Sequence, residues 1–287
     1  MATLYLIATP IGNLEDLTPR AARLLGAVAV IACEDTRRTA QLLAHCGLRT
    51  PLVSYHEHNE QRRTPELLAR LQAGQDVALV SDAGMPLLSD PGWVLVRAVL
   101  AAGIAVTPVP GPCALVAALA ASGFPALPFY FAGFLPPKPA ARQRLLAGWR
   151  QRPEAIVCYE APHRLLAALT DLEAVFGSDR PVAVARELTK LHEEILRGPI
   201  PELRAHFAQN PPRGEFTLVL APAPASQATD ATTVPGAAVE AMQALTAQGL
   251  DPKLAAKKLA RELGLPRAEL YRWWQRRGPA SAGTAAP

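Results

Sequence analysis

Residues 77–92 have the sequence V-A-L-V-S-D-A-G-M-P-L-L-S-D-P-G, which indicates the class of fold. Four apolar residues run into twelve residues that hold two glycines, two prolines, two serines and two aspartates. Such a segment is too constrained and too polar for a helix or an inner strand. A helix-like run, 93–102, follows it. An open α/β sheet binds its ligand at this place, beyond the carboxyl end of a strand; the alternative is an ordinary strand-to-helix turn.

Strand-like and helix-like runs alternate through the first half of the chain around this stretch. Apolar runs predict strands at 4–8, 28–32, 52–55, 77–80 and 105–109. The runs between them predict helices at 18–25, 36–46, 59–73, 93–102 and 113–122. This alternation is typical of an α/β fold with a largely parallel sheet covered by helices.

The second half repeats the pattern after a strand at 129–133 and a proline-rich linker at 136–139. A basic helix is predicted near 141–150 and another helix at 164–176, with strands at 155–159, 182–186 and 216–220. Residues 221–236 are rich in Ala, Pro, Ser and Thr, which is typical of a flexible tether. We therefore predict an α/β domain over 1–135, a second α/β domain over 136–222 and a helical unit over 237–278.

The positive charge of the chain lies in its C-terminal part. The formal net charge is +4, and residues 234–287 hold eight basic and four acidic side chains, so the first 233 residues are neutral. A helix ending at Gly264, a short turn and a helix beginning near Pro266 resemble a helix-turn-helix. A basic appendage on a neutral body suggests a polyanionic partner; the alternative is a merely solvated helix face.

Several classes of protein are disfavoured. The four cysteines form no C-x-x-C pair, which disfavours a zinc site and fits a reducing compartment. Residues 98–137 hold no Asp, Glu, Lys or Arg, but repeated Gly and Pro interrupt them before the roughly 20 residues that a spanning helix needs. After the first strand only Gly12 stands where a Rossmann site needs G-x-G-x-x-G, and no P-loop occurs.

The segment E-D-T-R-R-T, residues 34–39, follows the second predicted strand. Asp35 or Thr36 can cap the next helix. Capping does not explain the two arginines beside them, Arg37 and Arg38. Two guanidinium groups at the carboxyl end of a strand can hold a phosphate, so both interpretations stay open.

The segment H-E-H-N-E, residues 56–60, follows the third predicted strand. A His-x-His pair can bind a metal, but a third ligand at suitable spacing is missing. We therefore expect polar substrate contacts here rather than a metal site. Asn59 has the alternative role of capping the following helix.

Charged segments also lie at strand ends of the second half. They are Y-E-A-P-H-R at 159–164, R-E-L-T-K at 186–190 and G-E-F at 214–216. The segment V-P-G-P-C-A at 109–114 offers backbone donors at the end of the fifth strand. Charges at several strand ends are expected where a crevice forms between two halves.

Together these segments resemble the tetrapyrrole methylase superfamily of S-adenosylmethionine-dependent enzymes, and within it the branch that methylates ribosomal RNA. The resemblance covers roughly residues 3–222 and extends into the C-terminal helical unit. The glycine–proline loop is shared with the wider superfamily, whereas E-D-T-R, H-x-H-N-E and R-E-L-T-K point to the RNA branch. The further segments that carry it are T-P-I-G-N-L (9–14), P-G-P-C-A (110–114), G-F-L-P (133–136), Y-E (159–160) and H-R (163–164). The loop departs from the family at Met85, where threonine is usual.

The resemblance implies two α/β domains of the tetrapyrrole methylase type, with the cofactor S-adenosyl-L-methionine in the cleft between them, and a homodimer. It also implies methyl transfer to the ribose 2′-hydroxyl of a decoding-centre cytidine in the 16S rRNA of the small ribosomal subunit. We accordingly expect a cytoplasmic protein without a membrane partner. By position in the family's motifs, the cofactor pocket is lined by Pro10, Asp82, Ala83, Gly84, Leu87, Ala114 and Tyr159.

A ribose hydroxyl is a poor nucleophile until a base or a favourable field promotes loss of its proton. Glu187, Glu160 and His163 are the candidate bases, and Lys190 can stabilise developing negative charge. Glu187 can instead pair with Arg186 or Lys190 in a structural ion network. Substrate contacts are expected from Arg37, Arg38, His56, Asn59, Arg164, Lys257 and Lys258.

Two other functions remain open from the sequence. The body of the chain permits methylation of a tetrapyrrole ring, although a small substrate does not need the basic C-terminal part. A non-enzymatic regulator could use the helix-turn-helix, with the α/β body as a ligand sensor. The sequence lacks the second basic stripe that would support such a regulator.

Overall fold

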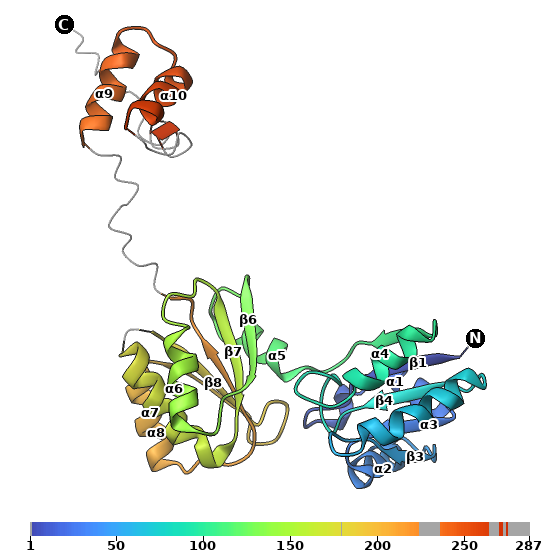
Figure 1. The fold of residues 1–287 in the computed structure, drawn as a ribbon. Coiled ribbons are helices and arrows are strands. Elements are labelled where there is room, and N and C mark those ends of the chain that lie inside the picture. Colours follow the sequence, from blue (N-terminus) through green and yellow to red (C-terminus); the bar gives the residue numbers. More distant parts are fainter. Residues whose placement is uncertain (1, 179, 224–235, 264–269, 272–273, 275–287) are drawn as a thin grey trace, which may run out of the picture. The chain divides into compact units, whose positions relative to one another are not determined.

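The computed structural model describes residues 2–178, 180–223, 236–263, 270, 271 and 274. The chain divides into two compact units, Met1–Pro224 and Ala225–Pro287. The first unit contains two five-stranded sheets, drawn in blue to cyan and in green to orange (Figure 1). No helix among the described residues is long and apolar enough to cross a bilayer.

All five strands of the first sheet run parallel. In spatial order they are β3 (Leu52–Ser54), β2 (Val30–Cys33), β4 (Val77–Val80), β1 (Thr3–Ile7) and β5 (Ala105–Val109). These strands agree with the predicted ones to within about two residues, the usual uncertainty at element ends. Because the strands are parallel, the loops after β1, β2 and β4 reach the same edge of the sheet.

Helices cover both faces of this sheet. Successive side chains of each strand point to opposite faces, so each strand packs against helices on both sides. In β4, Ala78 and Val80 face the cluster with α1 (Pro19–Ala27) and α2 (Thr36–His45). Val77 and Leu79 face the opposite cluster, with α3 (Glu60–Gln72) and α4 (Trp93–Ala101). All four residues of β4 are buried, which explains why the sequence V-A-L-V holds only apolar residues. A 3-10 turn, η1 (Leu14–Asp16), precedes α1.

The second sheet is mixed. Its spatial order is β6 (Phe129–Phe134), β7 (Ala155–Glu160), β10 (Phe216–Leu220), β8 (Val182–Arg186) and β9 (Glu194–Gly198). The β6–β7 pair is parallel and the other pairs are antiparallel. One face is covered by α6 (Pro139–Ala147), α7 (Leu165–Phe176) and α8 (Ile200–Gln209), and α5 (Ala114–Ala121) lies on the other (Figure 1).

The strand at 129–133, which the sequence assigned to the first domain, belongs to the second sheet. Tyr130 lies opposite Ile156 of β7. The chain leaves the first sheet before this strand, because α5 already packs on the second sheet through Leu115 and Leu119. The proline-rich segment at 136–139 leads directly into α6, with Pro139 in its first turn. The division into separately folding domains over 1–135 and 136–222 stays a prediction.

Two elements of the second half were not predicted, β9 and α8. β9 has the sequence E-I-L-R-G and is an edge strand. Its two charged residues, of which Arg197 is exposed, weaken the apolar signal. α8 contributes Ile200, Leu203 and Phe207 to the core beside α7. A short 3-10 turn, η2 (Pro162–Arg164), precedes α7.

The described part of the second unit is a small helical cluster. α9 (Gly236–Ala247) and α10 (Pro252–Leu263) pack through Ala238, Met242, Ala256 and Leu259. Leu270 is buried in the same cluster, with Tyr271 and Trp274 against it. Of the predicted helix-turn-helix, Gly264, the turn and most of the second helix lie outside the described residues.

Candidate functional site

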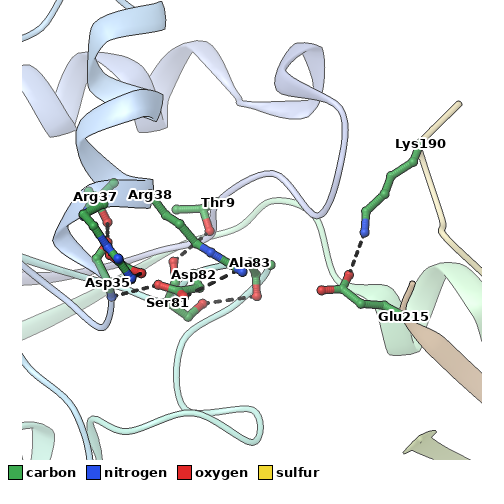
Figure 2. Close-up of polar contacts among 10 residues, drawn as sticks. Thr9, Asp35, Arg37, Arg38, Ser81, Asp82, Ala83, Lys190 and Glu215 are labelled. Carbon is green, nitrogen blue, oxygen red and sulfur yellow. Dashed lines mark hydrogen bonds and ion pairs between the residues drawn. The ribbon is translucent and has the colours of Figure 1, made fainter. Parts of the chain in front are cut away.

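The loops after β1 and β4 are joined at the carboxyl edge of the first sheet. Thr9 and Gly84 form an isolated β-bridge, with N···O distances of 2.9 and 3.0 Å. The Thr9 hydroxyl donates to the carbonyl of Ser81 at 3.1 Å, and the Ser81 hydroxyl donates to the carbonyl of Ala83 at 3.3 Å (Figure 2). These bonds fix the first part of the glycine–proline loop against the neighbouring strand.

The backbone of the glycine–proline loop adopts unusual torsion angles. Leu87 and Ser89 have φ values of +73° and +72°, a region that costs a non-glycine residue free energy. Gly92 has φ +137°, and a Cβ there would lie 2.6 Å from Cδ2 of Leu79. This conformation can occur only because the surrounding packing imposes it. Such stored strain is typical of functional loops.

A cavity of about 380 Å³ opens between this loop and the second sheet. Its size falls within the roughly 300–1,000 Å³ of small-molecule sites. Apolar side chains line much of it, together with backbone of the glycine–proline loop and several carboxylates. The lining residues are Ile11, Arg38, Asp82, Ala83, Gly84, Met85, Leu88, Ser89, Asp90, Cys113, Ala114, Phe134, Tyr159, Glu160, Ala161, Pro162, Gly214, Glu215, Phe216 and Thr217.

Glu160 gives the cavity a buried acceptor. The residue is 1% exposed, and its Oε1 accepts from the backbone N–H of Ala161 at 2.7 Å and pairs with Arg164 at 2.7 Å. Its Oε2 is buried and has no partner among the described residues. A buried acceptor without a partner costs about 1–3 kcal/mol, so this atom suits a ligand that brings a hydrogen-bond donor.

Acidic side chains gather where the loops after β2 and β4 meet. Asp82 accepts from the backbone N–H of Asp35 at 2.9 Å and lies 3.6 Å from Arg38 (Figure 2). Burial, and then the charges of Glu34 and Asp82, raise the pKa of Asp90 to about 7. Burial and the charge of Asp82 also raise the pKa of Glu34.

Asp35 caps α2, which was one of the two predicted roles for this segment. Its side chain accepts from the backbone N–H of Arg37 at 2.8 Å and pairs with the Arg37 guanidinium at 2.7 Å. The hydrogen bond from that guanidinium is the main cause that holds the pKa of Asp35 well below its usual range. The side chains of Arg37 and Arg38 remain 87% and 63% exposed. Both guanidinium groups are therefore accessible to a phosphate.

Glu187 and Lys190 form a network beside the cavity. The Lys190 ammonium donates to Glu187 at 2.7 Å and to Glu215 at 3.0 Å, and the backbone N–H of Glu215 donates to Glu187 at 3.0 Å (Figure 2 shows the Lys190–Glu215 pair). Burial alone would raise the pKa of Glu187, because it disfavours the charged carboxylate. The hydrogen bonds from Lys190 and Glu215 outweigh burial, so the pKa of Glu187 is lowered. A carboxylate held in this way is a weak base, so the network favours the ion-network interpretation of Glu187.

The network also joins the two halves of the first unit. The Thr189 hydroxyl accepts from the backbone N–H of Asn13 at 3.1 Å. A Cβ on Gly12 would lie 2.3 Å from Cγ of Lys190 and 3.0 Å from the carbonyl oxygen of Leu188. The loop after β1 therefore needs glycine where it meets the 186–190 segment.

The predicted cofactor residues divide into two groups. Asp82, Ala83, Gly84, Ala114 and Tyr159 line the cavity. Pro10 lies instead on a smaller hollow beside it, and Leu87 packs toward the core between β4 and α4.

The candidate catalytic and substrate residues of the second half are also spread. Glu160 lines the cavity, and Arg164 is engaged with it. His163 is exposed in η2 and does not line the cavity. Glu187 and Lys190 do not line the cavity themselves. They lie beside it because both contact Glu215, which does line it.

The segment at 56–60 meets the segment at 34–37 in a surface hollow lined also by Asp82. Asn59 accepts from the backbone N–H of His56 at 2.9 Å and donates to the carbonyl of Ser54 at 3.2 Å, so it shapes the turn before α3. Nδ1 of His56 is buried without a partner among the described residues. Within the described part of the chain, no group of three His, Cys, Asp or Glu is placed to hold a metal ion.

The remaining predicted substrate residues, Lys257 and Lys258, lie on α10 of the second unit and are exposed. The residues that sequence reasoning missed in the cavity include Ile11, Leu88, Ser89 and Asp90. The last three belong to the loop that the sequence had singled out. Their orientation depends on the positive φ values of Leu87 and Ser89, which no sequence pattern indicates.

The family model described as Tetrapyrrole (Corrin/Porphyrin) Methylases matches residues 3–204. The chain belongs to the tetrapyrrole methylase family. A relative from Synechocystis sp. named "Ribosomal RNA small subunit methyltransferase I" is 50% identical over 271 residues, 94% of this chain and 96% of the relative. A relative of the same name from Escherichia coli O157:H7 is 44% identical over 272 residues, 94% of this chain and 93% of the relative.

Solved methyltransferase structures show the same fold. The methyltransferase CobJ has a TM-score of 0.60 at 18% identity, covering 78% of this chain and 95% of that chain. Uroporphyrin-III-C-methyltransferase from Thermus thermophilus has a TM-score of 0.54 at 24% identity, covering 76% of this chain and 94% of that chain. Membership in the tetrapyrrole methylase family implies S-adenosyl-L-methionine as the methyl donor.

Proposed function

We propose that this protein transfers a methyl group from S-adenosyl-L-methionine to the 16S rRNA of the small ribosomal subunit, on the ribose 2′-hydroxyl of a decoding-centre cytidine. The observation that carries the proposal is the cavity at the glycine–proline loop, in a chain 44 to 50% identical to relatives named for methylation of small-subunit rRNA. The exposed arginines beside the cavity fit a substrate that carries phosphates.

The cofactor is proposed to lie in the cavity, against Asp82, Ala83, Gly84, Ala114 and Tyr159. S-adenosyl-L-methionine supplies a methyl group that is already activated, so the protein chiefly provides position and exclusion of water. The Thr9–Gly84 bridge brings loop backbone to the cavity wall, and Oε2 of Glu160 offers an acceptor for a donor group of the cofactor.

The RNA is proposed to approach over the segments at 34–38 and 56–59. Arg37 and Arg38 are exposed there and can contact phosphates. Arg38 also lines the cavity, so a phosphate on this arginine would place the adjoining ribose at the cavity mouth. Lys190, held between Glu187 and Glu215, adds a cation on the other side.

The same resemblance implies a homodimer that works in the cytoplasm, where small ribosomal subunits are made. Light scattering of the full chain measures the number of copies, and twice the 30.6 kDa chain mass is the expected result. A mass of one chain under assay conditions would contradict the dimer.

The test of the function is transfer of labelled methyl from S-adenosyl-L-methionine to small subunits from a strain that lacks this methylation. The subunits are digested and their nucleosides separated, and label in 2′-O-methylcytidine is expected. Subunits that already carry the modification serve as a control and take up no label. Cofactor binding without transfer to RNA would turn attention to tetrapyrroles, and no binding would contradict a methyltransferase.

The second unit is proposed to hold RNA through phosphate contacts. Replacing Lys257 and Lys258 together by alanine is expected to weaken binding to small subunits roughly tenfold, because about two phosphate contacts are lost. The slope of log affinity against log salt concentration should decrease by about 1–2 for the same reason. The control is Lys138→Ala, which removes an exposed lysine at the N-cap of α6 and should change neither quantity. An unchanged salt dependence in the double variant would contradict this role for α10.

A further inference from the structure

The carboxylates that line the cavity differ in how they are engaged. Asp82 accepts from a backbone N–H and faces Arg38. Glu160 is paired with Arg164, and Glu215 is paired with Lys190. Asp90 has no hydrogen bond or ion pair with any residue that the structure describes. Among the described residues, it is therefore the cavity carboxylate with both oxygens free to accept a proton from a substrate, whereas Glu160 has one oxygen paired with Arg164.

The backbone on both sides of Asp90 is tightly constrained. Ser89 before it has φ +72°, Pro91 after it has a ring-restricted φ, and Gly92 has φ +137° against Leu79. Ser89 also lies close to Gly133 of β6, where a Cβ would come within 3.4 Å of the serine hydroxyl. These constraints fix the place of Asp90 on the cavity wall, which is one part of the pre-organisation that a catalytic group needs.

We propose that Asp90 is the general base that removes the proton from the hydroxyl to be methylated. This inference rests on the proposed function and names the group that the reaction requires. The hydroxyl proton passes to the Asp90 carboxylate while the new O–CH₃ bond forms. The S–CH₃ bond of the donor breaks and its electron pair stays on sulfur, so a sulfonium and a carboxylate become a neutral thioether and a carboxylic acid. Asp90 is partly exposed, so its proton can return to solvent when the product leaves.

The groups around Asp90 suit this task. Glu34 follows β2 and Asp82 follows β4. Tyr159 and Glu160 belong to β7, and Glu215 directly precedes β10. Arg38 of α2 is the cation on the cavity wall, and it is 3.6 Å from Asp82. Burial and the like charges raise the pKa of Asp90 to about 7, close to the pH at which a base works best in a cell. Glu187, in contrast, is held ionised by its donors.

Asp90→Asn tests the proposal because it keeps the shape of the side chain and removes the base. With saturating cofactor and saturating subunits, the single-turnover rate is expected to fall by roughly 10²–10⁴-fold. Glu66→Gln removes a carboxylate from α3 that pairs with Arg63 away from the cavity, and its rate should equal that of the wild type. A rate for Asp90→Asn within about threefold of the wild type would overturn the proposal, since base catalysis typically contributes far more.

The pH dependence separates a base from a residue that only binds. For the wild type, the single-turnover rate should rise with pH and level off above about 7, as Asp90 loses its proton. This inflection should be missing in Asp90→Asn. Asp90→Glu keeps a carboxylate and should retain part of the rate together with an inflection. An unchanged inflection in Asp90→Asn would also overturn the proposal.

Folding and cofactor binding are controlled independently. A carboxyl whose pKa is raised in the folded state stabilises the fold below its ordinary pKa, and this stabilisation is lost as pH rises through about 7. Asp90→Asn stays neutral, so its melting temperature at pH 8 should be at or above that of the wild type, and the difference should vanish near pH 4. If the rate of Asp90→Asn returned to the wild-type value once the cofactor concentration was raised to saturation, Asp90 would be a binding residue and the proposal would fail.

The two proposals fail in different ways. If the wild-type protein transfers no methyl to small subunits, the proposed function is wrong and so is the base for that reaction. If the wild type is active and Asp90→Asn is equally active, the function stands and only the assignment of Asp90 falls.

Discussion

Ala114→Phe is expected to abolish cofactor binding and methyl transfer while leaving the fold intact. Ala114 is the first residue of α5 and lines the cavity beside Cys113. A phenyl ring at this position projects into a cavity of about 380 Å³ and takes the volume that the cofactor would occupy. The dissociation constant for S-adenosylhomocysteine, measured by titration calorimetry, should rise at least ~100-fold, or about 2.7 kcal/mol.

The control for this change lies on the same helix. Val116 is 55% exposed and does not line the cavity, so Val116→Phe adds the same ring without filling the site. Its affinity for S-adenosylhomocysteine should equal that of the wild type. Wild-type affinity in a folded Ala114→Phe protein would place the cofactor outside the cavity.

Arg142→Met is expected to produce the largest loss of stability, about 3–5 kcal/mol, because it leaves a buried carboxylate without its cation. The Arg142 side chain is 3% exposed, and its guanidinium lies 2.5 Å from Asp171. Asp171 also accepts from Gln143 at 2.6 Å, and Arg142 donates to the carbonyl of Pro136 at 3.3 Å. The network thus ties the start of α6 to α7, and chemical denaturation measures its loss.

The matched control is Arg204→Met, which removes an exposed arginine paired with Glu173 of the same helix α7. Exposed pairs contribute about 0–1 kcal/mol, so this variant should unfold almost like the wild type. Replacing Arg142 and Asp171 together by Met and Leu should cost less than Arg142→Met alone, because no charge is left buried. If Arg142→Met and Arg204→Met lowered the free energy of unfolding equally, burial would not determine how much an arginine–carboxylate pair contributes to stability.

The alternation of strands and helices could be predicted because buried parallel strands read as continuous apolar runs. The run V-A-L-V at 77–80 is an example, with all four residues buried. β9 was not predicted because an edge strand can hold charged residues among its apolar ones, as the half-buried Glu194 and the exposed Arg197 do here. The sequence placed the strand at 129–133 within 1–135 and did not show that it pairs with β7, because pairing between strands is a long-range property that local sequence does not contain.

The location of the candidate site followed from loop chemistry, but the roles within it did not. Residues 81–92 were expected at a ligand crevice, and several of them do line the cavity. The network around Glu187 depends on the backbone N–H of Glu215, which is distant in sequence. Asp90 has no hydrogen-bond or ion-pair partner among the described residues. This depends on how distant segments are arranged around it, which a sequence alone cannot show.

The decisive measurement is a crystal structure of the protein with S-adenosylhomocysteine. The ligand is expected in the cavity between the 81–92 loop and the second sheet, with its sulfur facing Asp90 and a donor group on Oε2 of Glu160. Ligand density in the hollow beside His56, or anywhere else outside this cavity, would show that the 81–92 loop is not the cofactor site.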